Sequence, residues 1–210
     1  MDLYISPLSC SLAAHVACLE AGLPVTLRRV DRATKRLDDG ADYLALAPLG
    51  NVPRLVAPDG AVLTEVSAVL QWIADQAPDR RLAPAWGTRE RYELVAWLSL
   101  VATELHKKHL WMIFTGGTPE PVKAWARASA TSTLGFVAAH LDAREFVVGD
   151  AFTVADAYLF WALLVAPHGG IALDAWPALS RYVKRMQRRD AVRAALALEV
   201  PMFGLERASA

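Results

Sequence analysis

Apolar and polar residues alternate at the start of the chain and then change to a helical spacing. Residues 2–5 (Asp-Leu-Tyr-Ile) alternate, which predicts a short strand. Leu12, Val16 and Leu19 then recur at the spacing of one apolar helix face. Gly22 follows at the position where a glycine commonly ends a helix. The chain is therefore expected to open with a strand followed by a helix.

The turn between this strand and this helix carries the first of two cysteines. Pro7 and the serines around it are typical of a turn, and Ser9 is the predicted N-cap of the helix. Cys10 then lies in the first helical turn. Unpaired N–H groups and the helix dipole favour a thiolate there, which lowers a thiol pKa from its free value of about 8.5. Such a place suits a sulfur anion, either the protein's own or a ligand's.

The second cysteine, Cys18, is expected to be a small buried apolar residue of the same helix. The two cysteines form no CxxC motif, and their spacing on one short helix fits disulfide geometry poorly. We therefore expect neither a dithiol redox site nor a metal site.

Strand and helix signals continue to alternate as far as residue 79, which is typical of an α/β unit. Residues 25–30 predict a second strand, parallel to the first by the usual crossover rule. Residues 54–57 and 62–64 flank a Pro-Asp-Gly turn and predict a hairpin. Residues 66–76 predict a helix with one apolar face. The expected order is β-α-β-(α)-β-β-α, with the bracketed helix in the segment between residues 31 and 53.

The pattern changes after a Pro- and Gly-containing linker at residues 78–87, because strand signals are not seen beyond it. Residues 88–114 and 119–141 predict two long helices, and Thr153-Val154-Ala155-Asp156 is a capping-box pattern before an apolar helix. We predict two domains, an α/β domain of residues 1–79 and an all-helical domain of residues 88–205.

Composition and charge narrow the classes of partner. Of the 210 residues 54% are hydrophobic and 21% charged, and 22 basic residues balance 22 acidic ones. A net charge of zero argues against nucleic acid or an anionic membrane surface as the main partner. No apolar run approaches the ~20 residues of a membrane span, and no basic segment followed by an apolar stretch opens the chain. We therefore expect a cytoplasmic protein.

Six motifs, in this order and at these spacings, resemble those of the cytosolic glutathione S-transferases, and most of all the bacterial beta class. They run over nearly the whole chain: Ser9-Cys10-Ser11-Leu12, Asn51-Val52-Pro53, Thr64-Glu65, residues 102–107 (Ala-Thr-Glu-Leu-His-Lys), residues 152–158 (Phe-Thr-Val-Ala-Asp-Ala-Tyr) and Trp176-Pro177.

The resemblance implies a fold, a co-substrate and a reaction. The fold is an α/β thioredoxin-like N-terminal domain plus an all-α C-terminal helical-bundle domain, assembled as a homodimer. The co-substrate is glutathione, and no metal is implied. The reaction is a detoxification transfer in which the activated glutathione thiol attacks a small hydrophobic electrophile.

In this family, backbone atoms next to the proline of the second motif bind the peptide. The Val52–Pro53 bond is cis in the family, which leaves the N–H and C=O of Val52 to pair with an extended peptide by strand addition. Lys35 stands where the family places a cation for the glycine-end carboxylate of glutathione. The first strand departs from the family, which usually has Tyr where this chain has Ile5, although Tyr4 is adjacent.

Glu65 is expected at the N-terminus of the helix of residues 66–76, where exposed N–H groups suit a carboxylate. Its side chain can also meet the ammonium group of glutathione. Val66 departs from the small or hydroxylated residue that the family usually has there, so Ser67 is the candidate hydroxyl donor. The predicted glutathione-binding residues of the first domain are thus Ser9, Lys35, Asn51, Val52, Pro53, Glu65, Val66 and Ser67.

His106 is the second predicted catalytic residue beside Cys10. The matching histidine of the beta class faces the cysteine, where an imidazole with an unperturbed pKa of about 6.5 can stabilise a thiolate or move a proton. Glu104 and Lys107 resemble residues that reach the glutathione of the neighbouring subunit. Ser99 replaces a usual Asn and has a shorter side chain.

The predicted acceptor pocket lies between the domains and is lined by Leu8, Leu110, Trp111 and Phe114, which suit an apolar electrophile. Two branches stay open at this point. Cys10 could form a mixed disulfide with glutathione, which leads to thiol transfer or peroxide reduction. Alternatively, the chain could be a non-catalytic ligand-binding or interaction module of this fold, or a zeta-like glutathione-dependent isomerase.

Overall fold

The computed structural model describes residues 1–209, with side chains as far as Gly204. The chain forms two compact units. Unit 1 contains Met1–Leu82 together with the chain from Asp190 onward, and unit 2 is Ala83–Arg189. The break near residue 82 falls within the linker of residues 78–87. The last helix is grouped with unit 1, whereas the sequence places it in the helical domain of residues 88–205.

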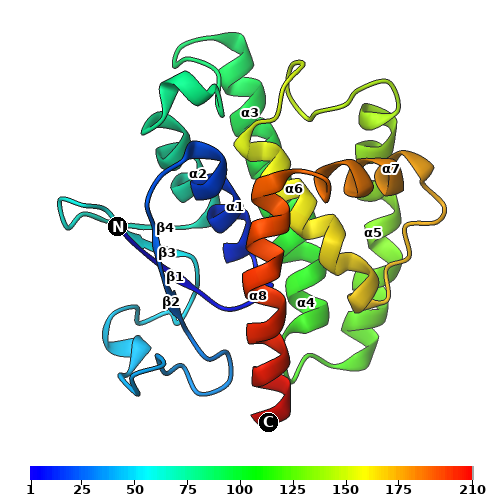
Figure 1. Cartoon of the computed structure of the whole chain (residues 1–210). Coiled ribbons are helices and arrows are strands. Elements are labelled where there is room, and N and C mark those ends of the chain that lie inside the picture. The colour runs from blue at the N-terminus through cyan, green and yellow to red at the C-terminus, as the bar shows by residue number, and fades with distance from the viewer. Residues whose placement is uncertain (210) are drawn as a thin grey trace. The chain divides into compact units, whose positions relative to one another are not determined.

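Unit 1 contains a four-stranded mixed sheet (Figure 1). Its strands are β1 (Asp2–Ile5), β2 (Thr26–Arg29), β3 (Arg54–Val56) and β4 (Val62–Thr64), in the order β2-β1-β3-β4. Strand β1 pairs parallel to β2, whereas β3 is antiparallel to both β1 and β4. Leu3 of β1 lies opposite Leu27 and Leu55. The predicted strands, the parallel crossover and the hairpin are all present.

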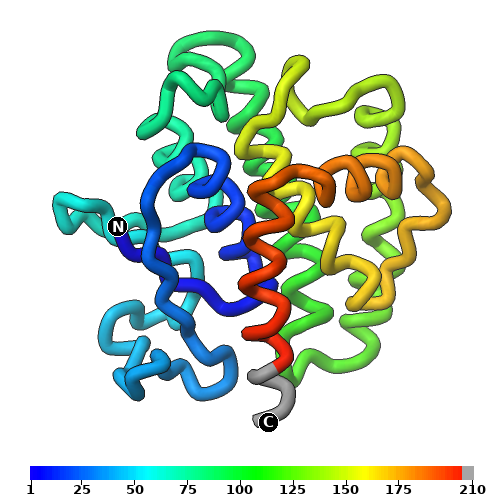
Figure 2. The backbone as a smooth tube through the Cα atoms, viewed as in Figure 1, coloured from blue at the N-terminus to red at the C-terminus, as the bar shows by residue number. Residues whose placement is uncertain are grey.

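Three helices pack together in unit 1: α1 (Ser11–Ala21), α2 (Val66–Asp75) and α8 (Asp190–Ser209). Helix α1 contacts both others, so the last helix lies beside the first although they are far apart in sequence (Figure 2). Gly22 ends α1 in the left-handed region, with φ of 68°. The predicted apolar face of α2 is buried, as Val66, Val69, Leu70 and Ile73 show.

The prediction of a helix between residues 31 and 53 is wrong. Every residue of this segment is described, and its one helical stretch is the 3-10 turn η1 (Tyr43–Ala45). Two isolated antiparallel β-bridges, Val30 with Leu37 and Arg36 with Asp42, hold the first part of this segment together. Acidic side chains that accept local backbone N–H groups, such as Asp31 and Asp42, favour turns here over a helix.

Unit 2 is helical throughout its described elements. They are α3 (Arg89–Leu100), the π-helical segment η3 (Val101–Leu110), α4 (Trp111–Phe114), α5 (Glu120–Leu141), α6 (Val154–Val165), η4 (Ala166–Gly169) and α7 (Pro177–Met186); the short turn η2 (Pro78–Arg80) precedes them in unit 1. The helix predicted for residues 88–114 is continuous, but its middle part is π-helical, which the sequence pattern does not reveal. Single π-helical insertions occur frequently at functional sites.

Helix α6 is the buried centre of unit 2, and its capping box is present as predicted. The Asp156 carboxylate accepts the N–H of Val147 at 2.9 Å and that of Thr153 at 2.8 Å, and it also accepts the Tyr182 hydroxyl at 3.0 Å. Burial raises the pKa of Asp156 to about 6, and these hydrogen bonds oppose that shift. The box fixes the start of α6 and joins it to α7.

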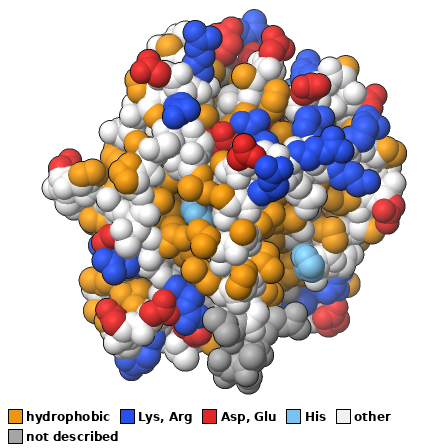
Figure 3. All heavy atoms as spheres, in the orientation of Figure 1, with side chains coloured by type: hydrophobic (Ala, Val, Ile, Leu, Met, Phe, Trp, Pro, Cys, Tyr) orange, Lys and Arg blue, Asp and Glu red, His pale blue; other side chains and the backbone are white. Residues whose placement is uncertain are grey.

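The surface charge is uneven although the net charge is zero. Lys and Arg side chains gather over α7 on the face shown in Figure 3. Arg181 of this helix pairs with Asp142, and the Arg185 guanidinium lies 5.5 Å from the Tyr182 ring centre. Within the described part of the chain, no helix is both long enough and apolar enough to cross a membrane.

Candidate functional site

Cys10 lies at the N-terminal end of α1, as the sequence predicts. The helix begins at Ser11 with Cys10 at its N-cap position, whereas the hydroxyl of Ser9 accepts the N–H of Ser11 at 3.3 Å. The prediction of Ser9 as the N-cap is therefore wrong by one residue, since Cys10 holds that position without a side-chain cap. The Cys10 side chain is 8% exposed, and its thiol donates a hydrogen bond to the carbonyl oxygen of Val52 at 3.1 Å.

The Val52–Pro53 bond is cis, as the resemblance implies, and lies at the start of β3. The hydroxyl of Tyr43 donates to the carbonyl oxygen of Asn51 at 2.7 Å and so holds the backbone before Val52. The N–H of Val52 makes no hydrogen bond with any described residue. A half-buried backbone edge with a spare donor, next to a sulfur, is the kind of surface to which an extended peptide adds.

Glu65 precedes α2 in a backbone conformation that non-glycine residues rarely adopt, with φ of 66° and ψ of 122°. The side chain of Glu65 is exposed, that of Val66 is buried and that of Ser67 is half-buried. The N–H groups of the first turn of α2 follow directly, and such groups favour a bound anion.

Lys35 also has a positive φ, of 56°, and its ammonium donates to the carbonyl oxygen of Gly50 at 3.1 Å. Burial lowers the pKa of Lys35, and the neighbouring charge of Arg32 lowers it further, whereas Asp31 raises it. The structure thus places the Lys35 ammonium against Gly50, the residue before Asn51, and the Cys10 thiol against Val52.

Positive φ angles are concentrated around this group of residues. Among the described non-glycine residues, φ is positive at Leu8, Lys35, Glu65 and Arg81. The first three were singled out in the sequence as candidate site residues. Backbone conformations of this kind cost of order 1–3 kcal/mol each and cluster at ligand-binding sites.

A buried contact between a glutamate and a histidine near Cys10 was not predicted. Glu199 of α8 is fully buried, and its carboxylate contacts Nδ1 of His15 at 2.8 Å and accepts the N–H of Leu8 at 2.8 Å. Glu199 therefore holds the turn two residues before Cys10. Sequence reasoning gave His15 no role and did not consider Glu199, because the two residues lie far apart in the chain and neither belongs to a local motif.

His106 lies in the π-helical segment η3 of unit 2 and is 7% exposed. Its Nδ1 is 2.8 Å from the hydroxyl oxygen of Tyr158, and the edge of its ring meets Trp161 with ring centres 4.7 Å apart. Burial lowers the pKa of His106 to about 3, and the charge of Lys107 adds to the effect. The imidazole is therefore neutral at pH 7.

The other predicted glutathione-binding residues of unit 2, from α3 and η3, are engaged within that unit. Glu104 forms an ion pair with Lys108 at 2.7 Å, and the ammonium of Lys107 lies 4.0 Å from the Trp111 ring centre. The hydroxyl of Ser99 donates to the carbonyl oxygen of Val95. Their predicted role in a neighbouring subunit stays a prediction.

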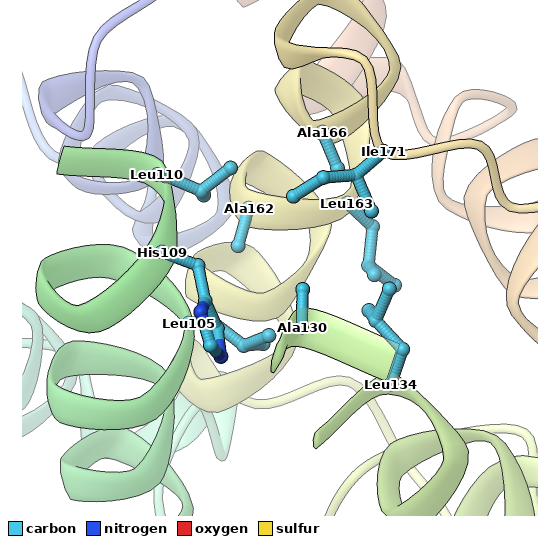
Figure 4. A pocket seen from close by; sticks show the side chains of 9 residues that line it. All are labelled: Leu105, His109, Leu110, Ala130, Leu134, Ala162, Leu163, Ala166 and Ile171. Carbon is cyan, nitrogen blue, oxygen red and sulfur yellow. The ribbon is translucent and has the colours of Figure 1, made fainter. Parts of the chain in front are cut away.

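The predicted acceptor-pocket residues differ in their surroundings. Trp111 and Phe114 are 42% and 44% exposed, whereas Leu8 of unit 1 is half-buried. Leu110 is 3% exposed and lines a small internal cavity of unit 2 beside Leu105 (Figure 4). Its side chain thus contributes to the packing of unit 2. Within the described residues, no group of three or more His, Cys, Asp or Glu side chains could hold a metal ion.

Comparison with known proteins decides the family. Residues 9–76 match the family model described as glutathione S-transferase, N-terminal domain, and residues 95–190 match that of the C-terminal domain. The chain belongs to the glutathione S-transferase family. Members of this family are glutathione-dependent transferases, and the fold class expected from the sequence is confirmed.

Relatives of this glutathione S-transferase match it over almost its full length. Glutathione S-transferase GstA of Escherichia coli O157:H7 is 39% identical over 199 residues, which cover 95% of this chain and 98% of that protein. The solved structure of a bacterial beta class transferase of Sphingomonas chungbukensis is 42% identical with a TM-score of 0.91, and covers 95% of this chain and 98% of its own.

A sphingomonad glutathione S-transferase solved in complex with glutathione is 40% identical with a TM-score of 0.91, over 95% of this chain and 98% of its own. These relatives confirm the predicted family and its likeness to the beta class. They favour neither a non-catalytic module nor a zeta-like isomerase.

Proposed function

We propose that this transferase binds glutathione along the backbone of Val52, with the glutathione sulfur beside Cys10. The observation that carries the proposal is the 3.1 Å contact between the Cys10 thiol and the Val52 carbonyl, because it joins the sulfur site to the peptide-binding edge. The cysteinyl residue of glutathione pairs with the N–H and C=O of Val52, as an added strand does.

The charged ends of glutathione require two further groups. We assign the glycine-end carboxylate to Lys35, which lies one hydrogen bond from Gly50. The other carboxylate binds the first-turn N–H groups of α2 at Val66 and Ser67, and Glu65 meets the ammonium group. Ser9 is next to Cys10, and Asn51 and Pro53 are next to Val52. These three residues complete the proposed glutathione-binding residues of unit 1.

The transfer step is a nucleophilic substitution or addition at carbon. The glutathione thiol loses its proton to water, and the thiolate forms a C–S bond with the electrophile. In a substitution a leaving group departs with its electron pair, and in an addition the resulting carbanion takes up a proton from water. The N-terminal end of α1 favours the thiolate over the thiol. The electrophile is proposed to be small and hydrophobic, and to contact Leu8, Trp111 and Phe114.

We propose that His106 acts in its neutral form. With a pKa of about 3 it carries no charge that could stabilise a thiolate at pH 7. When the Tyr158 hydroxyl donates to Nδ1, Nε2 carries the ring proton and can donate a hydrogen bond to the substrate. Ser99, Glu104 and Lys107 are proposed to complete the glutathione site of the partner in a homodimer. We expect the enzyme to work in the cytoplasm in detoxification.

A second reaction follows from the same sulfur. The Cys10 thiolate can attack the glutathione sulfur of oxidised glutathione or of a mixed disulfide between glutathione and another thiol, which forms a Cys10–glutathione disulfide and releases the other sulfur as a thiolate. A second glutathione thiolate can then regenerate Cys10 and return oxidised glutathione. This branch would make the protein a thiol transferase in addition to a conjugating enzyme.

Intact-mass measurement after incubation with oxidised glutathione tests both the site and this branch. We expect an adduct of one glutathione that dithiothreitol removes and that Cys10→Ala abolishes. Cys18→Ala is the matched control, because burial raises the pKa of Cys18 to about 12 and keeps its thiol protonated. An adduct that persists in Cys10→Ala would contradict the assignment of the sulfur site.

Turnover distinguishes an enzyme from a binding module. We expect glutathione-dependent conjugation of a generic aromatic electrophile such as 1-chloro-2,4-dinitrobenzene, saturable in both substrates. Tight binding of hydrophobic compounds without turnover would contradict the proposed transferase reaction.

A further inference from the structure

The segment between β2 and β3 carries two of the proposed glutathione contacts, Lys35 near its start and Val52 near its end. It has little regular structure beyond the turn η1. Long connections of this kind are commonly functional, and they need internal contacts to hold one conformation. Such contacts decide how well the two glutathione-binding points are placed relative to each other.

Tyr43 contacts Lys35 at one of these points and, at the other, Asn51, the residue before Val52. Its N–H donates to the carbonyl oxygen of Lys35 at 2.9 Å, and its hydroxyl donates to the carbonyl oxygen of Asn51 at 2.7 Å. The residue is fully buried. The Lys35 residue that it holds is the one with φ of 56°, so the N–H bond helps to fix a conformation that the backbone would otherwise leave.

The hydroxyl of Tyr43 is a permanent donor at physiological pH. Burial raises its pKa to about 12, so the phenol keeps its proton. The ring is held in place by Tyr4 of β1, with ring centres 5.6 Å apart, and the guanidinium of Arg54 lies 5.2 Å from the Tyr4 ring centre. Tyr43 is therefore anchored on the sheet while its two polar groups reach opposite ends of the segment.

We propose that Tyr43 is a positioning residue that sets the specificity of the enzyme for the complete tripeptide. It holds the Lys35 backbone and the backbone before Val52 in one arrangement, so that the glycine carboxylate and the cysteinyl residue of one tripeptide reach Lys35 and Val52 together. A thiol peptide that lacks glycine binds along Val52 but does not contact Lys35. Its KM therefore does not depend on the two hydrogen bonds of Tyr43, which we call the Tyr43 brace. The inference rests on the proposed glutathione contacts of Lys35 and Val52.

The test compares two thiol substrates, glutathione and γ-glutamylcysteine, in the full-length enzyme. Tyr43→Phe keeps the buried ring and removes the hydrogen bond to Asn51. We expect the KM for glutathione to rise about tenfold while kcat at saturation stays within about twofold. The KM for γ-glutamylcysteine is expected to change less than twofold, so the preference for the tripeptide falls by about the same tenfold.

Tyr4→Phe is the matched control, because it removes a hydroxyl from the adjacent ring and the Tyr4 hydroxyl has no hydrogen-bond partner among the described residues. It is expected to leave the preference unchanged. A cycle with Lys35→Met adds a second criterion. In the Lys35→Met background, Tyr43→Phe should raise the KM for glutathione less than twofold, since the brace then has no cation to place.

The outcomes are distinct. Equal rises in the two KM values, or additive effects of Tyr43→Phe and Lys35→Met, would overturn the proposal and leave Tyr43 a purely structural residue. A fall in melting temperature alone, with the substrate preference intact, would do the same. If the unmodified enzyme shows no saturable glutathione dependence, it is the proposed function that fails, and not the brace.

Discussion

His106 shows how much the chemistry of a residue depends on its surroundings. The sequence singles it out as a histidine beside Lys107, and an exposed imidazole would titrate near pH 6.5. The structure buries it against Tyr158 and Trp161, which lowers its pKa to about 3. Only the folded environment turns a candidate imidazolium into a neutral hydrogen-bonding group.

This shift predicts the pH dependence of stability. A histidine whose folded pKa is lowered binds a proton more readily in the unfolded chain. Its contribution to the free energy of unfolding is therefore fully present above pH 6.5 and is lost as the pH falls toward 3, at up to about 1.4 kcal/mol per pH unit. Asp156 has the opposite sign, because its raised pKa lowers stability as the pH rises from about 4 to about 6.

Urea titrations of the unmodified protein and of His106→Gln, at several pH values from 4 to 8, isolate the histidine. The difference in unfolding free energy between the two proteins should narrow as the pH falls below about 6.5. His168→Gln, at an exposed position, is the control. A difference that is independent of pH would show that His106 titrates normally.

At the scale of elements, the cap of α6 is a feature that the sequence does reveal. The spacing of Thr153 and Asp156 predicts the capping box, and the structure contains it. The pattern cannot show that Asp156 also accepts the Val147 N–H and the Tyr182 hydroxyl, since those partners come from other parts of the chain.

Asp156→Ala is expected to destabilise the protein by about 3 kcal/mol, because it removes a cap and leaves several buried donors without an acceptor. Asp156→Asn keeps one acceptor oxygen and should cost less. Denaturant unfolding monitored by circular dichroism measures both variants. A loss below about 1 kcal/mol in Asp156→Ala would show that the network contributes little.

The pairing of α1 with α8 is an element contact that local patterns could not predict. Glu199 joins His15 to the Leu8 N–H, so removing the carboxylate leaves two polar groups without their partner. Glu199→Ala is expected to lower the free energy of unfolding by about 3 kcal/mol, because a buried and a half-buried polar group lose their hydrogen-bond partner. Glu199→Gln retains an acceptor for Leu8 and should recover part of that loss. Equal stability of the two variants would contradict this reading of the contact.

For the whole molecule, local patterns in the sequence account for most elements and for the positions of Cys10, Val52 and Glu65. They do so because strand alternation, helix faces and caps are local properties. What they miss depends mostly on contacts between residues that are apart in the sequence: the grouping of α8 with unit 1 and the Tyr43 brace. The helix expected in the described residues 31–53 gives way to the turn η1 and to local hydrogen bonds of Asp31 and Asp42. The family resemblance supplied the glutathione site, and the structure supplied the contacts around it.

Assembly is a prediction at this scale. Sedimentation equilibrium is expected to give twice the 22.9 kDa mass of one chain, as the proposed homodimer requires. Glu104→Gln with Lys107→Gln should then raise the KM for glutathione without changing the mass. A monomer with full activity would contradict the proposed completion of the site by a partner subunit.

A crystal structure of the enzyme with glutathione tests the central claim most directly. The account predicts that the cysteinyl residue of glutathione pairs with the N–H and C=O of Val52. It also predicts the sulfur in contact with Cys10 and the glycine carboxylate within hydrogen-bond distance of Lys35. Glutathione bound elsewhere on the chain, or bound with its sulfur away from Cys10, would contradict the account.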